Sequence, residues 1–167
     1  MSTYGLDVRQ FRLCVVRPIQ TRLLLQAIPE NLIIGTALQE SRLIYLHQMG
    51  IGPAVGVCQM EGATHLDIWQ NFLKYQPELR AGLVKIAGYF SGDQPDPGEM
   101  AGNMNYAVGM CLTHYYRASK RTNHPMTIPS NTDAYAMAQV YKTFYNGPGA
   151  ATVDQALVHF QYAVSNP

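Results

Sequence analysis

The chain has 167 residues, 47% of them hydrophobic, which suits one globular domain with a sizeable core. Its net charge is +1, only 14% of its residues are charged, and no basic run is present, which argues against a nucleic-acid-binding surface. No apolar run approaches the roughly 18–20 residues that a membrane-spanning helix requires. Residues 1–12 lack the apolar run of a secretory signal, so we expect synthesis in the cytoplasm without a signal peptide.

The first half of the chain predicts helices around a glycine-rich turn. Apolar residues at helical spacing favour a helix over Glu30–His47 that begins after Pro29. The glycine-rich and β-branched segment Ile51–Gln59 indicates a turn with a short strand or hairpin. Thr64 has the residue type of a helix cap, which predicts a helix to about Leu73.

The second half is predicted to be mostly helical as well. A short helix is expected over Leu79–Tyr89, followed by a surface loop over residues 92–100, where two prolines and two glycines occur in nine residues. Met104–Arg117 is apolar at nearly every turn, which favours a central buried helix whose tyrosines belong to the core. The polar segment 120–133 is expected to connect it to the next helix.

The last helices are marked by their end signals. Ala134–Tyr145 is predicted to be a helix that stops at Gly147-Pro148-Gly149. Thr152 and Gln155 match a capping box that opens a final amphipathic helix. With no internal repeat or linker, we predict a mainly α single domain over 1–167, with its motif-bearing core at about 29–165.

Glu40 is the first candidate for chemistry. On a helix, its neighbours three and four positions away are Thr36, Ala37, Leu43 and Ile44, and three of these four are apolar. Burial against such a face disfavours the ionised carboxylate and raises its pKa, as a general acid near neutral pH requires. The alternative is a solvated glutamate on an amphipathic helix.

Four motifs in order resemble those of the lysozyme-like lytic transglycosylases, which cut the glycan strands of peptidoglycan. They are Glu40-Ser41, then Gly56-Val57-Cys58-Gln59 with its glutamine 19 residues after Glu40, then Asn105 to Leu112 in an N-x-x-x-G-x-x-L arrangement, then Tyr145 to Gly149. The resemblance covers roughly two-thirds of the chain. It implies a lysozyme-like fold with a small β-hairpin or loop region after the catalytic helix. The chain departs from the family pattern at Cys58 and at Met60-Glu61. It also departs at residues 146–149, Asn-Gly-Pro-Gly, which lack the usual alanine.

The resemblance also implies roles for individual residues. Glu40 would be the catalytic acid that protonates the oxygen between N-acetylmuramic acid and N-acetylglucosamine. Ser41 would contact substrate or orient the acid, and Tyr145 would hydrogen-bond near the acid and help to position it. Gln59 and Met60 would bind the sugar, and Asn146 would shape the same wall of the cleft. Alternatives remain for three of them: Ser41 as a helix surface residue, and Tyr145 and Asn146 as residues that only terminate a helix.

The reaction has two alternatives at this stage. The resemblance favours a single acid, assisted by the substrate's own N-acetyl group and ending in a 1,6-anhydro ring. Ordinary glycosidases use two carboxylates, and the candidates for a second are Glu61 and Asp67, both of which a position near a helix start also explains. A third reading is a non-catalytic, lysozyme-like structural protein of a phage particle.

Cofactors are not expected. Cys14, Cys58 and Cys111 are odd in number and widely spaced, which favours reduced, mostly buried thiols. Pairs such as Cys58 with His65, or Cys111 with His114, do not form a four-ligand zinc pattern, so those histidines are expected to be hydrogen-bonded at the edge of the core. The expected partners are peptidoglycan strands and, if the chain is of phage or prophage origin, other virion proteins. It would act on the bacterial cell wall from a virion or during lysis.

Overall fold

The computed structural model describes residues 5–88 and 94–167, and it confirms a mainly α fold with a small antiparallel hairpin. The helical elements are α1 (Val8–Phe11), the π-helix η1 (Arg12–Val16), α2 (Arg17–Leu23), α3 (Glu30–Ser41), α4 (Gly62–Asn71), the 3-10 helix η2 (Leu73–Tyr75), α5 (Pro77–Ala87), α6 (Glu99–Gly102), α7 (Met104–Ser119), α8 (Ala134–Val140), the π-helix η3 (Tyr141–Asn146) and α9 (Val153–Ser165). The strands are β1 (Ala54–Val55) and β2 (Met60–Glu61).

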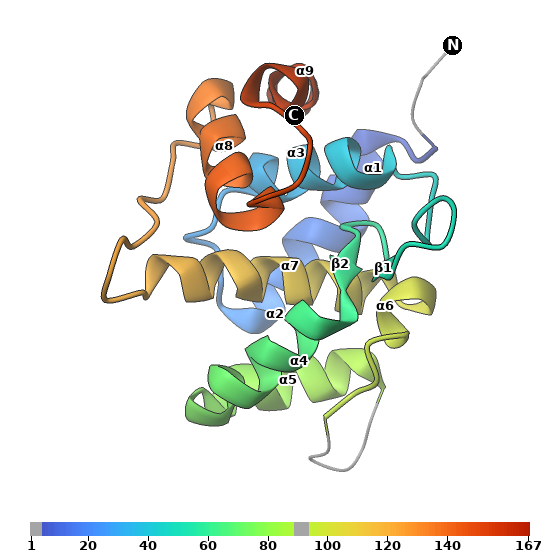
Figure 1. Cartoon of the computed structure of the whole chain (residues 1–167), viewed down its shortest axis with the longest axis vertical. Helices are drawn as coiled ribbons and strands as arrows, with labels where there is room; N and C mark the ends of the chain where they lie inside the picture. Colours follow the sequence, from blue (N-terminus) through green and yellow to red (C-terminus); the bar gives the residue numbers. More distant parts are fainter. Residues whose placement is uncertain (1–4, 89–93) are drawn as a thin grey trace.

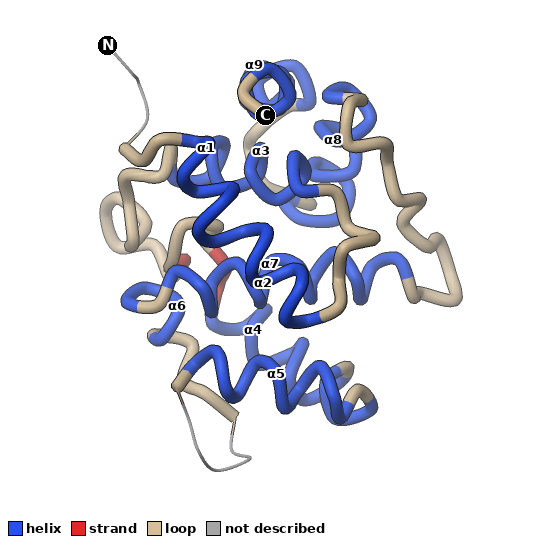
Figure 2. Tube along the Cα trace, turned by 180° about the vertical axis from the view of Figure 1, so that it is seen from behind, coloured by secondary structure: helices blue, strands red, loops and turns tan. Residues whose placement is uncertain are grey.

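Helix α7 lies at the centre of the molecule (Figure 1), with α8 and α9 on one side and α4 and α5 on the other. Seen from behind, α2 lies in front of it (Figure 2). Gly109 allows α5 to pack closely against α7, because a Cβ at position 109 would lie 2.9 Å from the side chain of Leu83 in α5. Tyr106 and Tyr115 are fully buried, as predicted, and Tyr116 packs partly buried against the core.

Helix α3 ends at Ser41, so the prediction that it continues to His47 is wrong. Arg42 and Leu43 both adopt left-handed backbone conformations, with φ of 53° and 56°. The backbone N–H of Leu43 donates to the hydroxyl of Ser41 at 3.1 Å, which supports the turn. Apolar residues at helical spacing continue past this point, but Ile44 is 49% exposed rather than buried.

The hairpin follows this turn. β1 pairs with β2 in the register Ala54↔Glu61 and Val55↔Met60, which confirms the predicted hairpin and places its second strand just beyond the predicted segment. Gly56 has a φ of 77°, and a Cβ there would lie 2.6 Å from the carbonyl oxygen of Met100. The turn therefore needs glycine for its conformation and for its close approach to α6.

Several boundaries differ from the prediction. Helix α4 begins at Gly62, with Glu61 rather than Thr64 at its N-cap, and ends at Asn71. Helix α5 begins at Pro77, where proline suits a first turn, and the predicted end at Tyr89 lies outside the described residues. The short helix α6 occupies the end of the predicted surface loop 92–100, whose first two residues are also outside the described range. The capping box at Thr152 is confirmed, because both of its hydrogen bonds form.

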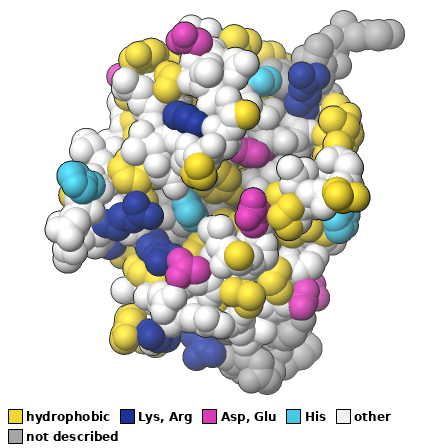
Figure 3. Space-filling view, viewed as in Figure 1, with side chains coloured by type: hydrophobic (Ala, Val, Ile, Leu, Met, Phe, Trp, Pro, Cys, Tyr) yellow, Lys and Arg dark blue, Asp and Glu magenta, His cyan; other side chains and the backbone are white. Residues whose placement is uncertain are grey.

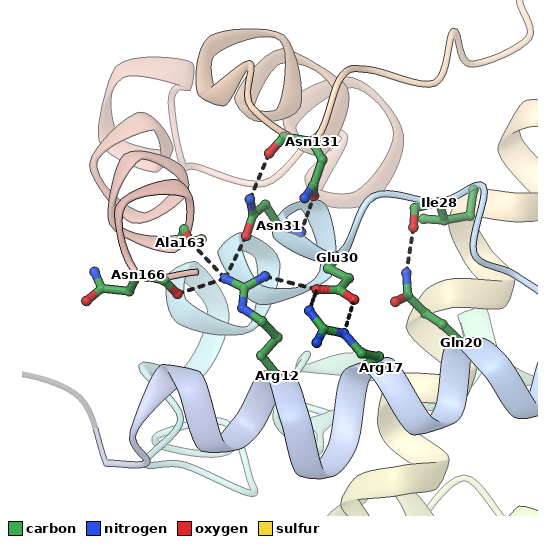
Figure 4. A network of polar contacts seen from close by, with 9 residues as sticks. All are labelled: Arg12, Arg17, Gln20, Ile28, Glu30, Asn31, Asn131, Ala163 and Asn166. Carbon is green, nitrogen blue, oxygen red and sulfur yellow. Dashed lines mark hydrogen bonds and ion pairs between the residues drawn. The ribbon is translucent and has the colours of Figure 1, made fainter.

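The N-terminal helices are joined to the C-terminal end of the chain through Arg12 (Figure 4). Arg12 is only 3% exposed, and its guanidinium bonds Glu30 at 3.2 Å and Asn31 at 2.8 Å at the start of α3. It also donates to the carbonyl oxygens of Ala163 and Asn166, each at 2.9 Å, at the end of α9. A buried cation with this set of partners joins α1–η1 to both helices.

Among residues 5–88 and 94–167, no helix is long and apolar enough to cross a membrane. Cys58 and Cys111 are buried and Cys14 is exposed, and all three are free thiols.

Candidate active site

Glu40 lies in the last turn of α3, at the edge of a cleft of about 590 Å³. Figure 3 shows this face of the molecule, with acidic side chains and a histidine grouped near its middle. The other side chains that line the cleft come from the hairpin, α4, α7, η3 and the segment after it: Gln48, Ala54, Gln59, Met60, Glu61, Thr64, His114, Tyr145, Asn146, Pro148, Gly149 and Ala150. Five of the six residues expected at the site therefore share one cleft.

The carboxyl of Glu40 has a raised pKa, in the direction that the sequence analysis predicted. Burial is the main cause, and hydrogen bonds with Tyr141 and Asn146 partly oppose it. Of the four helix neighbours expected for Glu40, Thr36 and Ala37 are buried in α3, whereas Leu43 and Ile44 lie beyond the end of the helix. Because burial outweighs the hydrogen bonds, the protonated acid persists to a higher pH than in a free glutamate.

Tyr141 is the direct partner of this acid, and the sequence analysis did not select it. Its hydroxyl donates to Oε1 of Glu40 at 2.5 Å. Tyr141 lies four residues before Tyr145 in a predicted helix, so the two side chains are expected on the same face. This spacing could have identified Tyr141 as a site residue. Both tyrosines belong to the π-helix η3, a type of turn that is often found at functional sites.

Tyr145 holds η3 against the segment that leads to Gln59. Its hydroxyl donates to the carbonyl oxygen of Cys58 at 2.8 Å. Its ring stacks between those of Tyr115 and Tyr141, with centroids 5.4 and 6.2 Å away. Tyr145 therefore shapes the cleft through the Cys58 carbonyl, while Tyr141 contacts the acid.

Gln59 and Met60 form the hairpin side of the cleft. Gln59 has a left-handed φ of 46°, and its side-chain amide donates to the carbonyl oxygen of Gly56 at 2.8 Å. This bond fixes the amide at the cleft wall next to Glu40. Met60 is buried in β2 and contributes an apolar surface.

Asn146 lies at the end of η3 in a turn that Lys142 stabilises. The ammonium of Lys142 donates to Oδ1 of Asn146 at 3.2 Å and to the carbonyl oxygens of Gly147 at 2.9 Å and Gly149 at 2.6 Å. The turn forms the wall opposite the hairpin. Asn146 thus ends the helix and also lines the cleft.

Ser41 is placed differently from the other candidates. It is 1% exposed, which contradicts its reading as a helix surface residue. Its hydroxyl contacts the carbonyl oxygens of Ala37 at 3.1 Å and Val57 at 2.7 Å. Ser41 therefore ties the end of α3 to the hairpin, immediately beside the acid.

The two candidate second carboxylates are separated by the structure. Glu61 is exposed and lines the cleft with Glu40. Asp67 forms an ion pair with Arg117 at 2.5 Å and accepts a hydrogen bond from Asn71, and the bond from Arg117 is the main reason that its pKa is lowered. Of these two carboxylates, only Glu61 lines the same cleft as Glu40.

The two histidines are hydrogen-bonded at the core, as expected. Nε2 of His114 donates to the carbonyl oxygen of Phe144 at 2.7 Å, and burial lowers the pKa of its imidazole. Nε2 of His65 bonds the hydroxyl of Tyr106 at 2.6 Å. In the part of the chain that the structure describes, no three His, Cys, Asp or Glu residues are grouped to hold a metal ion.

In the comparisons with known proteins, no family model, curated protein or solved structure matches the chain.

Proposed function

We propose that the protein cleaves the glycan strands of peptidoglycan, with Glu40 as its catalytic acid. The observation that carries this proposal is a single half-buried carboxyl with a raised pKa, hydrogen-bonded by Tyr141, in a cleft of about 590 Å³. The motif resemblance identifies peptidoglycan as the substrate class. Hydroxyl, amide and imidazole groups on the cleft walls suit a hydroxyl- and amide-bearing glycan.

A second hollow supports a polymeric substrate. It has a volume of about 410 Å³ and shares Glu40, Gln48 and Gln59 with the first, so the acid stands where the two hollows meet. A substrate bound at Glu40 would extend from the main cleft into this hollow. This arrangement suits a substrate larger than a single sugar ring.

The proposed reaction begins with protonation. Glu40 donates its proton to the glycosidic oxygen as that bond breaks, and the substrate's N-acetyl oxygen assists at the anomeric carbon. Glu40 is then a carboxylate, which the hydrogen bond from Tyr141 stabilises. It accepts the proton of the C6 hydroxyl as that oxygen attacks the anomeric carbon and displaces the N-acetyl oxygen, which yields the 1,6-anhydro product of a lytic transglycosylase.

Glu61 gives a specific reason to retain the hydrolytic alternative. It lines the cleft, and no ion pair engages it among the described residues. A carboxylate in this position could activate a water, and the product would then be a reducing end. A muramidase is therefore the second candidate.

The biological setting is also part of the proposal. A compact enzyme of this kind suits a phage or prophage, acting on the wall from the virion at entry or during lysis. Its partners would then include other virion proteins.

The test is mass spectrometry of the fragments that the protein and its Glu40→Gln variant release from purified sacculi. Anhydro-muramic products from the parent alone would support a transglycosylase with Glu40 as the acid. Reducing-end products would point to hydrolysis and to Glu61. If neither protein releases fragments, the non-catalytic structural reading replaces the enzymatic one.

A further inference from the structure

The second hollow beside Glu40 differs in chemistry from the main cleft. Apart from Glu40, the fixed charge on the main cleft is the carboxylate of Glu61, whereas the second hollow is lined by the guanidinium of Arg42. Tyr45 and Met49 lie beside Arg42 and are 39% and 72% exposed. A cation next to exposed apolar groups suits an anion with an apolar body.

None of the described carboxylates forms an ion pair with Arg42. Arg42 interacts electrostatically with His159 of α9, whose pKa is lowered by burial and then by Arg42, so this imidazole does not offset the positive charge. Within the described part of the chain, the guanidinium charge at the rim of the hollow is therefore uncompensated.

The backbone at this rim is held in place. Arg42 and Leu43 both have left-handed φ angles, and Gln59 across the hollow has one of 46°. The Arg42 carbonyl accepts a 3.0 Å hydrogen bond from the N–H of Gly5, and Ser41 is bonded to the hairpin. Non-glycine residues in this conformation persist only where the surroundings fix them, and they cluster at ligand sites.

An unpaired polar atom adds to these features. Gln39 lines the hollow, and its side-chain oxygen is buried without a hydrogen-bond partner among the described residues. Buried polar atoms are normally satisfied, so an unpaired one beside a hollow indicates a group that arrives from outside. An amide N–H of a ligand in the hollow is the kind of donor that this oxygen lacks.

We propose that the hollow lined by Arg42 and Tyr45 binds the peptide stem of the muramic acid, so that peptide-bearing strands are the preferred substrate. The inference rests on the proposed function, because it assigns a second part of the same substrate. A peptide stem has free carboxylates for Arg42, aliphatic side chains for Tyr45 and Met49, and amide N–H groups for Gln39. It is attached to the sugar chain, which places it within reach of a hollow that shares Glu40 with the cleft.

The test compares strands that carry peptide stems with strands from which an amidase has removed them. For the parent, we expect a higher kcat/KM on the peptide-bearing strands. Arg42→Gln should lower the ratio of the two kcat/KM values about three- to tenfold, the effect of one partly exposed charge-assisted hydrogen bond. Arg42→Lys should restore most of the ratio. Arg9→Gln, an exposed arginine on α1 that lines neither hollow, is the matched control.

Binding provides a readout that does not depend on turnover. Calorimetry on Glu40→Gln should show tighter binding of a disaccharide that bears a tripeptide than of the bare disaccharide, and the difference should shrink with added salt. Equal cleavage of both strands, unchanged by Arg42→Gln, would overturn this inference and leave the proposed function in place. Cleavage of neither strand and binding of neither ligand would overturn both.

Discussion

The hydroxyl of Tyr141 lies 2.5 Å from Oε1 of Glu40, although the two residues are 101 positions apart in the chain. The contact brings the end of α3 and the start of η3 together, and it partly opposes the effect of burial on the pKa of the acid. Burial of the carboxyl favours the protonated form, and the hydrogen bond from Tyr141 favours the ionised form.

Replacing Tyr141 with phenylalanine should raise the pKa of Glu40 further, because it removes a bond that stabilises the carboxylate. A general acid is active while protonated, so activity is lost as the pH rises through this pKa, and the alkaline limb of the profile should move to higher pH. We expect the maximal kcat to fall about tenfold or more. The pH dependence of sacculus digestion measures both effects, and Tyr145→Phe, which leaves the Glu40 contact intact, should not move the limb.

Ser41→Ala should reduce stability more than substrate binding. The substitution leaves the carbonyl oxygen of Val57, on a residue that is 1% exposed, without its 2.7 Å partner. An unsatisfied buried carbonyl costs about 1–3 kcal/mol. Urea unfolding should show this loss. A raised KM with unchanged stability would instead indicate that Ser41 contacts substrate directly.

Gly56→Ala and Gly50→Ala form a matched pair. Both glycines have positive φ, 77° and 84°, so each substitution adds conformational strain of about 1–2 kcal/mol. Only at Gly56 would the new Cβ also approach the Met100 carbonyl, at 2.6 Å, whereas at Gly50 nothing lies within 4 Å. Thermal unfolding should therefore show a clearly larger loss for Gly56→Ala. Equal losses would mean that the hairpin moves away from α6 at no cost.

His65 should make stability depend on pH in mildly acidic solution. Burial lowers the pKa of its imidazole to about 4, against 6.5 for the free side chain. Between these values the unfolded chain binds a proton that the folded chain does not, so the free energy of unfolding decreases as the pH falls, by about 1.4 kcal/mol per unit. Urea unfolding from pH 7 to 4.5 measures this slope. His65→Phe should flatten it, and an unchanged slope would assign the effect to other groups.

Removing Arg12 should be among the most damaging single changes outside the cleft. Arg12→Ala leaves two carbonyls at the end of α9 and Oδ1 of Asn31 without a donor, and loss of a partner in a buried ionic network costs about 3–5 kcal/mol. Arg17→Ala is the control, since Arg17 bonds the same Glu30 but is 53% exposed. Its loss of stability should be much smaller. Similar losses of stability for both variants would mean that Arg12 stabilises the fold through its ion pair with Glu30 rather than through the carbonyls of α9.

The features that the sequence predicted correctly depend on local signals. The capping box at Thr152 and Gln155 is complete within four residues, and the core face of α7 repeats with the helical period. The end of α3 was not predictable in this way, because Leu43 and Ile44 continue the apolar spacing. The helix ends where Arg42 and Leu43 adopt left-handed conformations, next to the bond between Ser41 and Val57, a residue 16 positions later.

The candidate site shows the same division. Glu40 and Gln59 were predicted by their order in the chain, and the structure places them in one cleft. Tyr141 was missed because its partner, Glu40, is 101 residues away in the chain. Asp67 remained a candidate second carboxylate because its ion pair with Arg117, 50 residues away, cannot be read from the sequence. Contacts of this range are set by the packing of helices, which periodicity does not describe.

The bonds from Arg12 to the carbonyls of Ala163 and Asn166 also determine when folding can finish. They join residues 151 and 154 positions apart, so the ribosome must synthesise the chain as far as residue 166 before both can form. At about 5–20 residues per second, that interval is on the order of ten seconds. During it, Arg12 stays hydrated rather than buried, so η1 cannot reach its final packing. We therefore expect the domain to complete its folding only after residue 166 has been synthesised and has left the ribosome.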